Sequence, residues 1–242
     1  MAGFLPTRGL GLILSSGNRT VEPYFRHYAP ENMAVFTTRM RMGAGGGRSM
    51  EEIANDAIEA ARLLSDAKVD VICLQGTGIM IERGPSGEAE LIADICKATA
   101  TPTFTAAQAV VEAVRALSLD RMVMVHPLGE KPMARERNYL ESLGVNVVHA
   151  AGRGGREQSA AIPSNVWADL AIENDREDAE GFFLSGSNTT MTEAVESIEL
   201  KTGKPVVTSV QASLWAGVRR VLGINNAYET PPSMLGRLLT IT

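Results

Sequence analysis

The chain has 242 residues, of which 45% are hydrophobic and 21% charged, and its formal net charge at pH 7 is -5. This composition is ordinary for a globular protein and excludes intrinsic disorder. The negative charge gives no electrostatic support for nucleic-acid binding, and two cysteines are too few for a disulfide framework. The N-terminal residues do not resemble a signal peptide, and no stretch approaches the roughly 18 apolar residues that cross a bilayer. We therefore expect a cytoplasmic protein with no nucleic-acid or membrane partner.

The first half alternates short apolar runs with helical patterns. In chain order we predict strands at 10–14 and 35–42, a helix from 49 to about 64, a strand at 69–74, and helices at 88–98 and 106–117. The spacing of Ser49 and Glu52 is typical of a capping box that opens a helix. The glycine tract 43–47 predicts a mobile loop, and residues 101–103 predict a short extended link.

The second half continues the alternation. We predict a strand at 122–125, a helix at 133–143, a strand at 145–149, a helix after Pro163, a strand at 180–184, a helix at 192–201, a strand at 205–208 and a helix at 211–222. The tail from Tyr228 is expected to form a C-terminal clasp or a partner contact. Strand–helix alternation of this kind indicates an α/β fold with a parallel sheet and helices on both faces.

In parallel sheets, ligands bind outside the carboxyl ends of the strands, which here directs attention to loops 15–18, 76–78, 126–130 and 185–190. Two of these loops resemble one another, because residues 14–22 and 184–193 both open with Leu-Ser and share an Asn and a Thr. A duplicated half-domain would place them face to face across a cleft. The alternative is that Ser, Gly and Asn are simply common turn residues.

From about residue 10 to 223 the chain resembles the aspartate/glutamate racemase superfamily, on the branch of the maleate cis-trans isomerases and arylmalonate decarboxylases. Five segments in order carry the resemblance: residues 15–22, Gln75-Gly76-Thr77-Gly78 with Glu82-Arg83-Gly84, residues 134–140, residues 184–188, and residues 205–209 with Trp215. The resemblance implies two pseudo-symmetric lobes, each a mostly parallel four-stranded sheet flanked by helices, with the active site between them. We expect residues 1–120 with about 210–242 to form the first lobe and about 121–209 the second.

The family's racemases and isomerases use two cysteines that face the substrate without a cofactor, and the decarboxylase keeps only the second. The matching positions here are Gly76 and Gly186, and Leu128 stands where a substrate-contacting tyrosine is usual. Cys73 lies inside a predicted strand and Cys96 on a predicted helix, so both are expected to be structural. A non-cysteine mechanism is therefore predicted.

The remaining groups form a polar, glycine-lined pocket. Backbone N–H groups at strand-to-helix turns, with a helix dipole behind them, favour anions and suit an oxyanion hole. The predicted substrate-binding residues are Ser16, Asn18, Gly76, Thr77, Gly78, Gly186, Asn188 and Thr189.

The predicted catalytic residues are His126, Glu130 and Ser187. His126 ends a strand on the functional edge and is the best-placed titratable group, although a lone histidine is often a capping or surface residue. Ser185 and Ser187 are nucleophiles only beside a base that the sequence does not identify. His149, Arg153 and Arg156 form a second polar cluster, and no ligand spacing supports a metal site.

The sequence leads to a cofactor-free enzyme that acts on a small carboxylate or on a carbonyl or amide compound, by hydrolase- or lyase-like chemistry. The alternatives are an isomerase, racemase or decarboxylase of the family type, and a catalytically silent carboxylate-binding protein. A homo-oligomer is also expected, since most soluble oligomers are symmetric assemblies of one chain.

Overall fold

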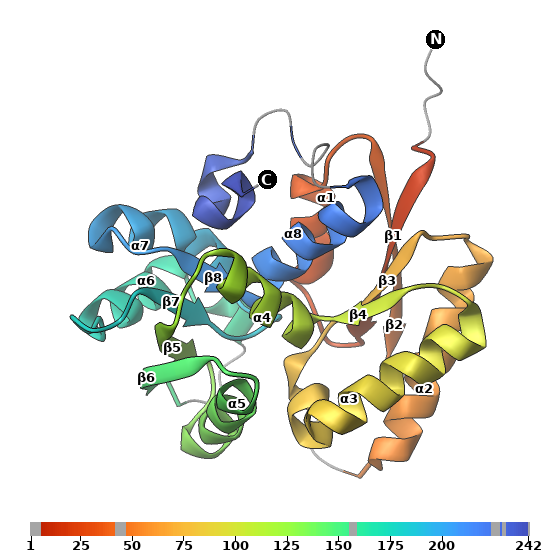
Figure 1. Ribbon diagram of the computed structural model, residues 1–242, viewed down its shortest axis with the longest axis horizontal. Coiled ribbons are helices and arrows are strands. Elements are labelled where there is room, and N and C mark those ends of the chain that lie inside the picture. The colour runs from red at the N-terminus through yellow and green to blue at the C-terminus, as the bar shows by residue number, and fades with distance from the viewer. Residues whose placement is uncertain (1–5, 42–46, 155–158, 224–227, 229–230, 242) are drawn as a thin grey trace.

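Two four-stranded sheets form the framework of the protein (Figure 1). The computed structural model describes residues 6–41, 47–154, 159–223, 228 and 231–241. The strand orders are β2-β1-β3-β4 and β6-β5-β7-β8, and neighbouring strands are parallel. The second order repeats the first, which confirms the predicted class of two parallel α/β halves.

The first sheet and its helices come from the N-terminal half. Its strands are β1 (Arg8–Ser15), β2 (Met33–Met40), β3 (Val71–Leu74) and β4 (Thr103–Thr105). Its helices are α1 (Val21–Tyr28), α2 (Met50–Asp66), α3 (Thr77–Thr99) and α4 (Ala106–Ala116). The buried strands β1 and β3 pair with Leu12 opposite Cys73.

The second sheet and its helices follow. Its strands are β5 (Arg121–His126), β6 (Asn146–Gly152), β7 (Gly181–Leu184) and β8 (Val206–Thr208). Its helices are α5 (Glu130–Ser142), α6 (Ser164–Glu173), α7 (Val195–Thr202) and α8 (Ser209–Leu222), with short 3-10 helices η1 (Ser159–Ala161) and η2 (Met191–Ala194).

Two predictions in the first half were incomplete. The link expected at 101–103 is followed by a strand, β4, which pairs with β3. The helix expected at 88–98 is the second part of α3, which begins at Thr77 and bends at Gly84 (φ 70°, ψ 173°) just before Pro85. Most of the glycine tract, residues 43–46, lies outside the described residues. The capping box is confirmed, because the Ser49 hydroxyl accepts from the Glu52 N–H (3.1 Å) and the Glu52 carboxylate accepts from the Ser49 N–H (2.7 Å).

Helices α4 and α8 lie between the two sheets (Figure 1) and begin in the same way. The hydroxyls of Thr105 and Thr208 accept hydrogen bonds from the N–H groups of Gln108 and Gln211, both at 3.1 Å, and each glutamine side chain accepts from the threonine N–H in return. Helix α8 packs against β1 and β3 of the first sheet, while α4 packs against α8 and β8. One apolar core therefore runs through both halves.

The C-terminal tail packs on its own chain, in keeping with a clasp. Its described part contains the 3-10 helices η4 (Ser233–Leu235) and η5 (Arg237–Thr240), which contact α7 and α8. Leu238 is completely buried, and the carbonyl of Leu235 accepts a hydrogen bond from the side-chain amide of Gln211.

We propose that the two sheets define the two lobes, with the boundaries predicted above. Across the described ranges, none of the helices is long and apolar enough to span a membrane.

Candidate functional site

A cavity of about 330 Å³ opens at the carboxyl ends of the strands, between the two halves. The first half contributes residues of α2 and the start of α3, and the second half contributes the end of β5, the start of α5 and the loop after β7. The lining residues are Met50, Ile53, Thr77, Gly78, Ile81, Glu82, His126, Pro127, Leu128, Pro132, Arg135, Glu136, Ser185 and Gly186. Of the predicted site residues, the cavity brings together His126, Thr77, Gly78 and Gly186.

A buried polar cluster forms one wall of this cavity. His126 ends β5, Glu136 lies on α5 and Ser185 follows β7, and their exposed fractions are 5%, 2% and 1%. The Nε2 atom of His126 lies 3.1 Å from Oε2 of Glu136, and the Ser185 hydroxyl donates a hydrogen bond to the same oxygen. Two donors, His126 and Ser185, therefore contact one carboxylate oxygen of Glu136, and the three residues come from different parts of the fold.

Backbone contacts fix the orientation of the His126 ring. The N–H of Leu128 points at Nδ1 over 3.0 Å, so Nδ1 is an acceptor and carries no proton. The proton of the neutral ring is then on Nε2, where it is donated to Glu136. This assignment follows from the hydrogen-bond geometry.

The other two predicted catalytic residues lie outside the cavity lining. Glu130 is exposed at the first position of α5, and Glu136 further along the same helix is the carboxylate that meets His126. The carbonyl of Ser187 accepts hydrogen bonds from Asn18 (3.0 Å) and from the Thr20 hydroxyl (2.7 Å). Sequence reasoning missed Glu136, and the only signal was its place in the resembling segment 134–140.

The turn from β3 into α3 supplies the other polar wall. Gly76 occupies the N-cap of α3 with φ 113°, and as a glycine it offers no side-chain acceptor to the first backbone N–H groups of the helix. Thr77 and Gly78 follow it and both line the cavity. This wall offers neutral donors to an anionic oxygen.

The turn after β7 is tight. Gly186 has φ 122°, its N–H donates to the hydroxyl of Ser209 (3.2 Å), and its carbonyl accepts from the hydroxyl of Thr189 (3.0 Å). A Cβ atom at this position would lie 2.9 Å from the Thr189 methyl group and 3.2 Å from Pro127. Thr189 therefore contacts Gly186 and stabilises the turn. Gly186 lines the cavity, and Thr189 is not among the lining residues.

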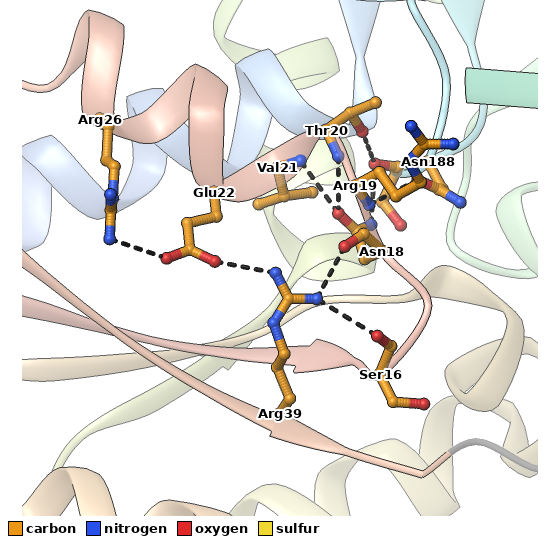
Figure 2. Close-up of polar contacts among 10 residues, drawn as sticks. Ser16, Asn18, Arg19, Thr20, Val21, Glu22, Arg26, Arg39 and Asn188 are labelled. Carbon is orange, nitrogen blue, oxygen red and sulfur yellow. Dashed lines mark hydrogen bonds and ion pairs between the residues drawn. The ribbon is translucent and has the colours of Figure 1, made fainter. Parts of the chain in front are cut away.

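The two similar loops do meet, as Figure 2 shows in part. The side-chain amide of Asn18 reaches the carbonyl of Ser187, and the Arg19 N–H donates to Oδ1 of Asn188 over 2.8 Å. Asn18 also caps α1, because its Oδ1 accepts from the N–H groups of Thr20 and Val21. Asn18 and Asn188 thus join the halves, and neither is among the residues that line the cavity.

Arg39 stabilises the first of these loops, which contains Ser16 and Asn18 (Figure 2). Its guanidinium donates to the carbonyls of Asn18 (2.7 Å) and Ser16 (3.4 Å) and pairs with Glu22 (2.8 Å). Ser16 itself is exposed and does not line the cavity.

Neither cysteine reaches the cavity. Cys73 is completely buried in β3, and burial raises the pKa of its thiol to about 12. Cys96 lies in the last third of α3 and is not a lining residue. Neither thiol is therefore among the groups that line this cavity.

Apolar side chains complete the lining. Met50 and Ile53 come from α2, Ile81 from α3, and Leu128 and Pro132 from the segment after β5. At the exposed rim, Arg135 and Glu82 approach within 4.0 Å from opposite halves. The lining of the cavity thus combines polar and apolar side chains.

The second predicted polar cluster is separate. His149 contacts Asn174 (3.1 Å) and Arg176 (2.9 Å), and neither it nor Arg153 lines the cavity. Arg156 lies outside the described residues. Within the described ranges, no group of three or more His, Cys, Asp or Glu residues is arranged to hold a metal ion.

Comparisons with known proteins agree with this architecture. The arylmalonate decarboxylase family matches residues 19–233. The arylmalonate decarboxylase of Bordetella bronchiseptica is 26% identical over 192 residues, covering 78% of this chain and 80% of that protein. The maleate isomerase of Pseudomonas putida KT2440 is 26% identical over 223 residues, covering 86% and 89%.

A solved structure supports the same fold. The maleate isomerase Iso variant of Pseudomonas putida S16 with maleate superposes with a TM-score of 0.83 at 23% identity, covering 97% of this chain and 98% of that one. Both sequence relatives are named as enzymes, and the family match spans most of the chain. The protein belongs to the arylmalonate decarboxylase family.

Proposed function

We propose that the protein is a lyase that removes carbon dioxide from a small malonate-type dicarboxylate bearing an apolar substituent. The observation that carries the proposal is the mixed lining of the cavity, in which polar groups such as Thr77 and Glu136 occur together with apolar side chains such as Ile53 and Leu128. The family match and the decarboxylase relative support the reaction class.

The apolar residues of the lining favour a decarboxylase over a maleate isomerase. Maleate carries a carboxylate at each end, and burying a charged group against apolar side chains is unfavourable. A malonate carries both carboxylates on one carbon, so its substituent can contact the apolar side chains of the lining while the carboxylates contact the polar groups. The isomerase reaction remains the second candidate because a maleate isomerase matches 86% of the chain.

Decarboxylation suits a site that holds an anion without a thiolate. The bond between the central carbon and one carboxylate breaks, carbon dioxide leaves, and the electron pair forms an enediolate with the remaining carboxylate. Donors at the start of α3, including the Thr77 hydroxyl, would stabilise the enediolate oxygens more strongly than the initial carboxylate. A proton must then reach the central carbon.

The hydrolytic chemistry that we expected as one main possibility gains no support. In the serine–histidine pair of a hydrolase the imidazole accepts the serine proton, whereas here the Ser185 hydroxyl donates to Glu136 and His126 donates to the same oxygen. The relatives are a decarboxylase and an isomerase. We also retain the prediction of a cofactor-free reaction, for which activity after dialysis against EDTA should be unchanged.

The test is turnover of a panel of 2-arylmalonates and 2-alkylmalonates, followed by carbon dioxide release, with maleate as the comparison substrate. Thr77→Val should reduce decarboxylation by about 10²-fold, the typical cost of losing one oxyanion donor. Thr240→Val is the matched control, since that hydroxyl bonds only to the tail carbonyl of Arg237. Conversion of maleate without any decarboxylation would instead favour the isomerase, and binding without turnover would favour a silent carboxylate-binding protein.

A further inference from the structure

We propose that Glu136 is the catalytic acid that delivers the proton to the central carbon, and that His126 and Ser185 position it. This inference rests on the proposed decarboxylation. It assigns to a carboxyl group of α5 the step for which the cavity offers no thiol.

The two oxygens of Glu136 have different surroundings. Oε2 accepts hydrogen bonds from the Nε2–H of His126 and from the Ser185 hydroxyl. Oε1 makes no hydrogen bond to any residue in the part of the chain that the structure describes, although Glu136 lines the cavity. One oxygen is therefore anchored, and the other is available to carry a proton to a bound ligand.

The neighbours of Glu136 are poor proton donors to a substrate in this arrangement. The Nε2–H of His126 is engaged by Glu136, and its Nδ1 accepts from the backbone N–H of Leu128. The Ser185 proton is also donated to Glu136. Both groups instead fix the plane of the carboxyl, because two donors from different elements hold a single oxygen.

The other carboxylate at the cavity is less suited to the task. Glu82 lies at the rim, its side chain is 62% exposed, and its nearest cationic partner is Arg135. A proton on such a group exchanges freely with water and approaches the substrate from no fixed direction. The buried position of Glu136 on one side of the cavity predicts protonation of one face of the enediolate only.

Loss of carbon dioxide leaves an electron pair in the enediolate, and this pair forms a new C–H bond with the proton of the Glu136 carboxyl. The O–H bond of Glu136 breaks, which leaves a carboxylate with both positioning hydrogen bonds intact. Water then returns one proton to Glu136, so each turnover consumes one proton from solvent.

The decisive experiment uses a prochiral 2-aryl-2-methylmalonate and measures carbon dioxide release together with the enantiomeric purity of the 2-arylpropionate. Glu136→Gln keeps the shape and an acceptor for His126 and Ser185 but cannot transfer a proton. We expect the wild type to give one enantiomer and the variant to give a racemate with a rate lowered by about 10²- to 10⁴-fold. Glu141→Gln, on the exposed side of the same helix, is the matched control and should behave as wild type.

A variant that still gives a single enantiomer at any rate overturns the inference, and so does a racemic product from the wild type. If Glu136→Gln does not fold, Ser185→Ala tests the inference instead. Removing one positioning donor should lower both the rate and the enantiomeric purity of the product. Unchanged values would contradict the inference.

A failure of the proposed decarboxylation can be distinguished from a failure of the proposed role of Glu136. A wild type that releases no carbon dioxide overturns decarboxylation, and the proton transfer is then measured alone as deuterium incorporation at the α-carbon of 2-arylpropionate in D₂O. Incorporation that is lost in Glu136→Gln supports the role of Glu136. Incorporation absent from the wild type, or equal in the two proteins, overturns it.

Discussion

The phenol hydroxyl of Tyr139 donates a hydrogen bond to the carboxylate of Glu88, which joins α5 to α3 inside the protein. Both residues are buried, and the other oxygen of Glu88 accepts from the Thr105 hydroxyl. Helix α5 carries Glu136 and helix α3 carries Thr77, so this contact links the two polar walls of the cavity. Burial, together with the neighbouring Glu88, raises the pKa of the Tyr139 hydroxyl, which keeps it protonated as a donor.

Tyr139→Phe should therefore destabilise the protein, because Glu88 is left buried with a single donor. The expected loss is about 1–3 kcal/mol in the free energy of unfolding, measured by urea denaturation. Tyr28→Phe is the control, since the hydrogen-bond partner of that hydroxyl among the described residues is the Met234 sulfur at 4.0 Å, and it should cost less than about 0.5 kcal/mol. Equal losses in the two variants would show that the Glu88 contact contributes no stability.

Asn18 is expected to matter for stability through two separate contacts. Asn18→Ala removes the cap of α1 and the bond to the Ser187 carbonyl, and should cost about 1–3 kcal/mol in thermal unfolding. Asn18→Asp keeps the cap, but it loses the bond to Ser187 and places a carboxylate oxygen against that carbonyl. We expect the retained cap to leave its stability between those of the wild type and Asn18→Ala. The exposed Ser16→Ala serves as control, and an Asp variant as unstable as the Ala variant would argue against a contribution from the cap.

Cys73 is expected to be inert in the folded protein. With its thiol pKa raised to about 12 by burial, iodoacetamide at pH 8 should modify Cys73 only after unfolding. Peptide mass spectrometry of native and urea-treated protein measures this directly. Modification of Cys73 in the native state at the rate of the unfolded state would contradict complete burial.

The same thiol predicts a pH dependence with a definite sign. Below a pH of about 9 it is protonated in both folded and unfolded chains, and between about 9 and about 12 only the unfolded chain releases the proton. Stability is then fully present below pH 9 and is lost as pH rises, by up to about 1.4 kcal/mol per pH unit. The stability difference between wild type and Cys73→Ala, measured by urea denaturation at pH 8 and 10.5, should therefore shrink at the higher pH.

Gly186 is expected to resist substitution. Gly186→Ala forces a side chain into φ 122° and places its Cβ 2.9 Å from the Thr189 methyl group, so we expect a loss of about 1–3 kcal/mol. Gly17→Ala has no atom within 4 Å of the added Cβ and should be nearly neutral. Calorimetric melting temperatures compare the two, and similar values would show that the turn after β7 relaxes easily.

The sequence predicted most strands because buried parallel strands leave short apolar runs, as at β1 and β7. It missed the first turns of α3 because Gly78, Gly84 and Pro85 interrupt the helical pattern, and it missed β4 because three residues are too few for a periodic signal. The sequence placed His126 at the edge where the cavity opens because it ends a strand. Glu136 was not, since its partners Ser185 and His126 come from other elements and only folding brings them together.

The placement of α8 between the sheets affects how the protein unfolds. Gly217 of α8 lies so close to Leu10 of β1 that a methyl group there would approach its side chain to 2.8 Å, and Leu10 shares one apolar cluster with Phe183 of β7. A fragment ending near residue 120 would lack α8 and expose the face of β1 and β3 that it covers. Neither half should fold as an isolated polypeptide, and denaturation should proceed as one all-or-none event in which both sheets melt together.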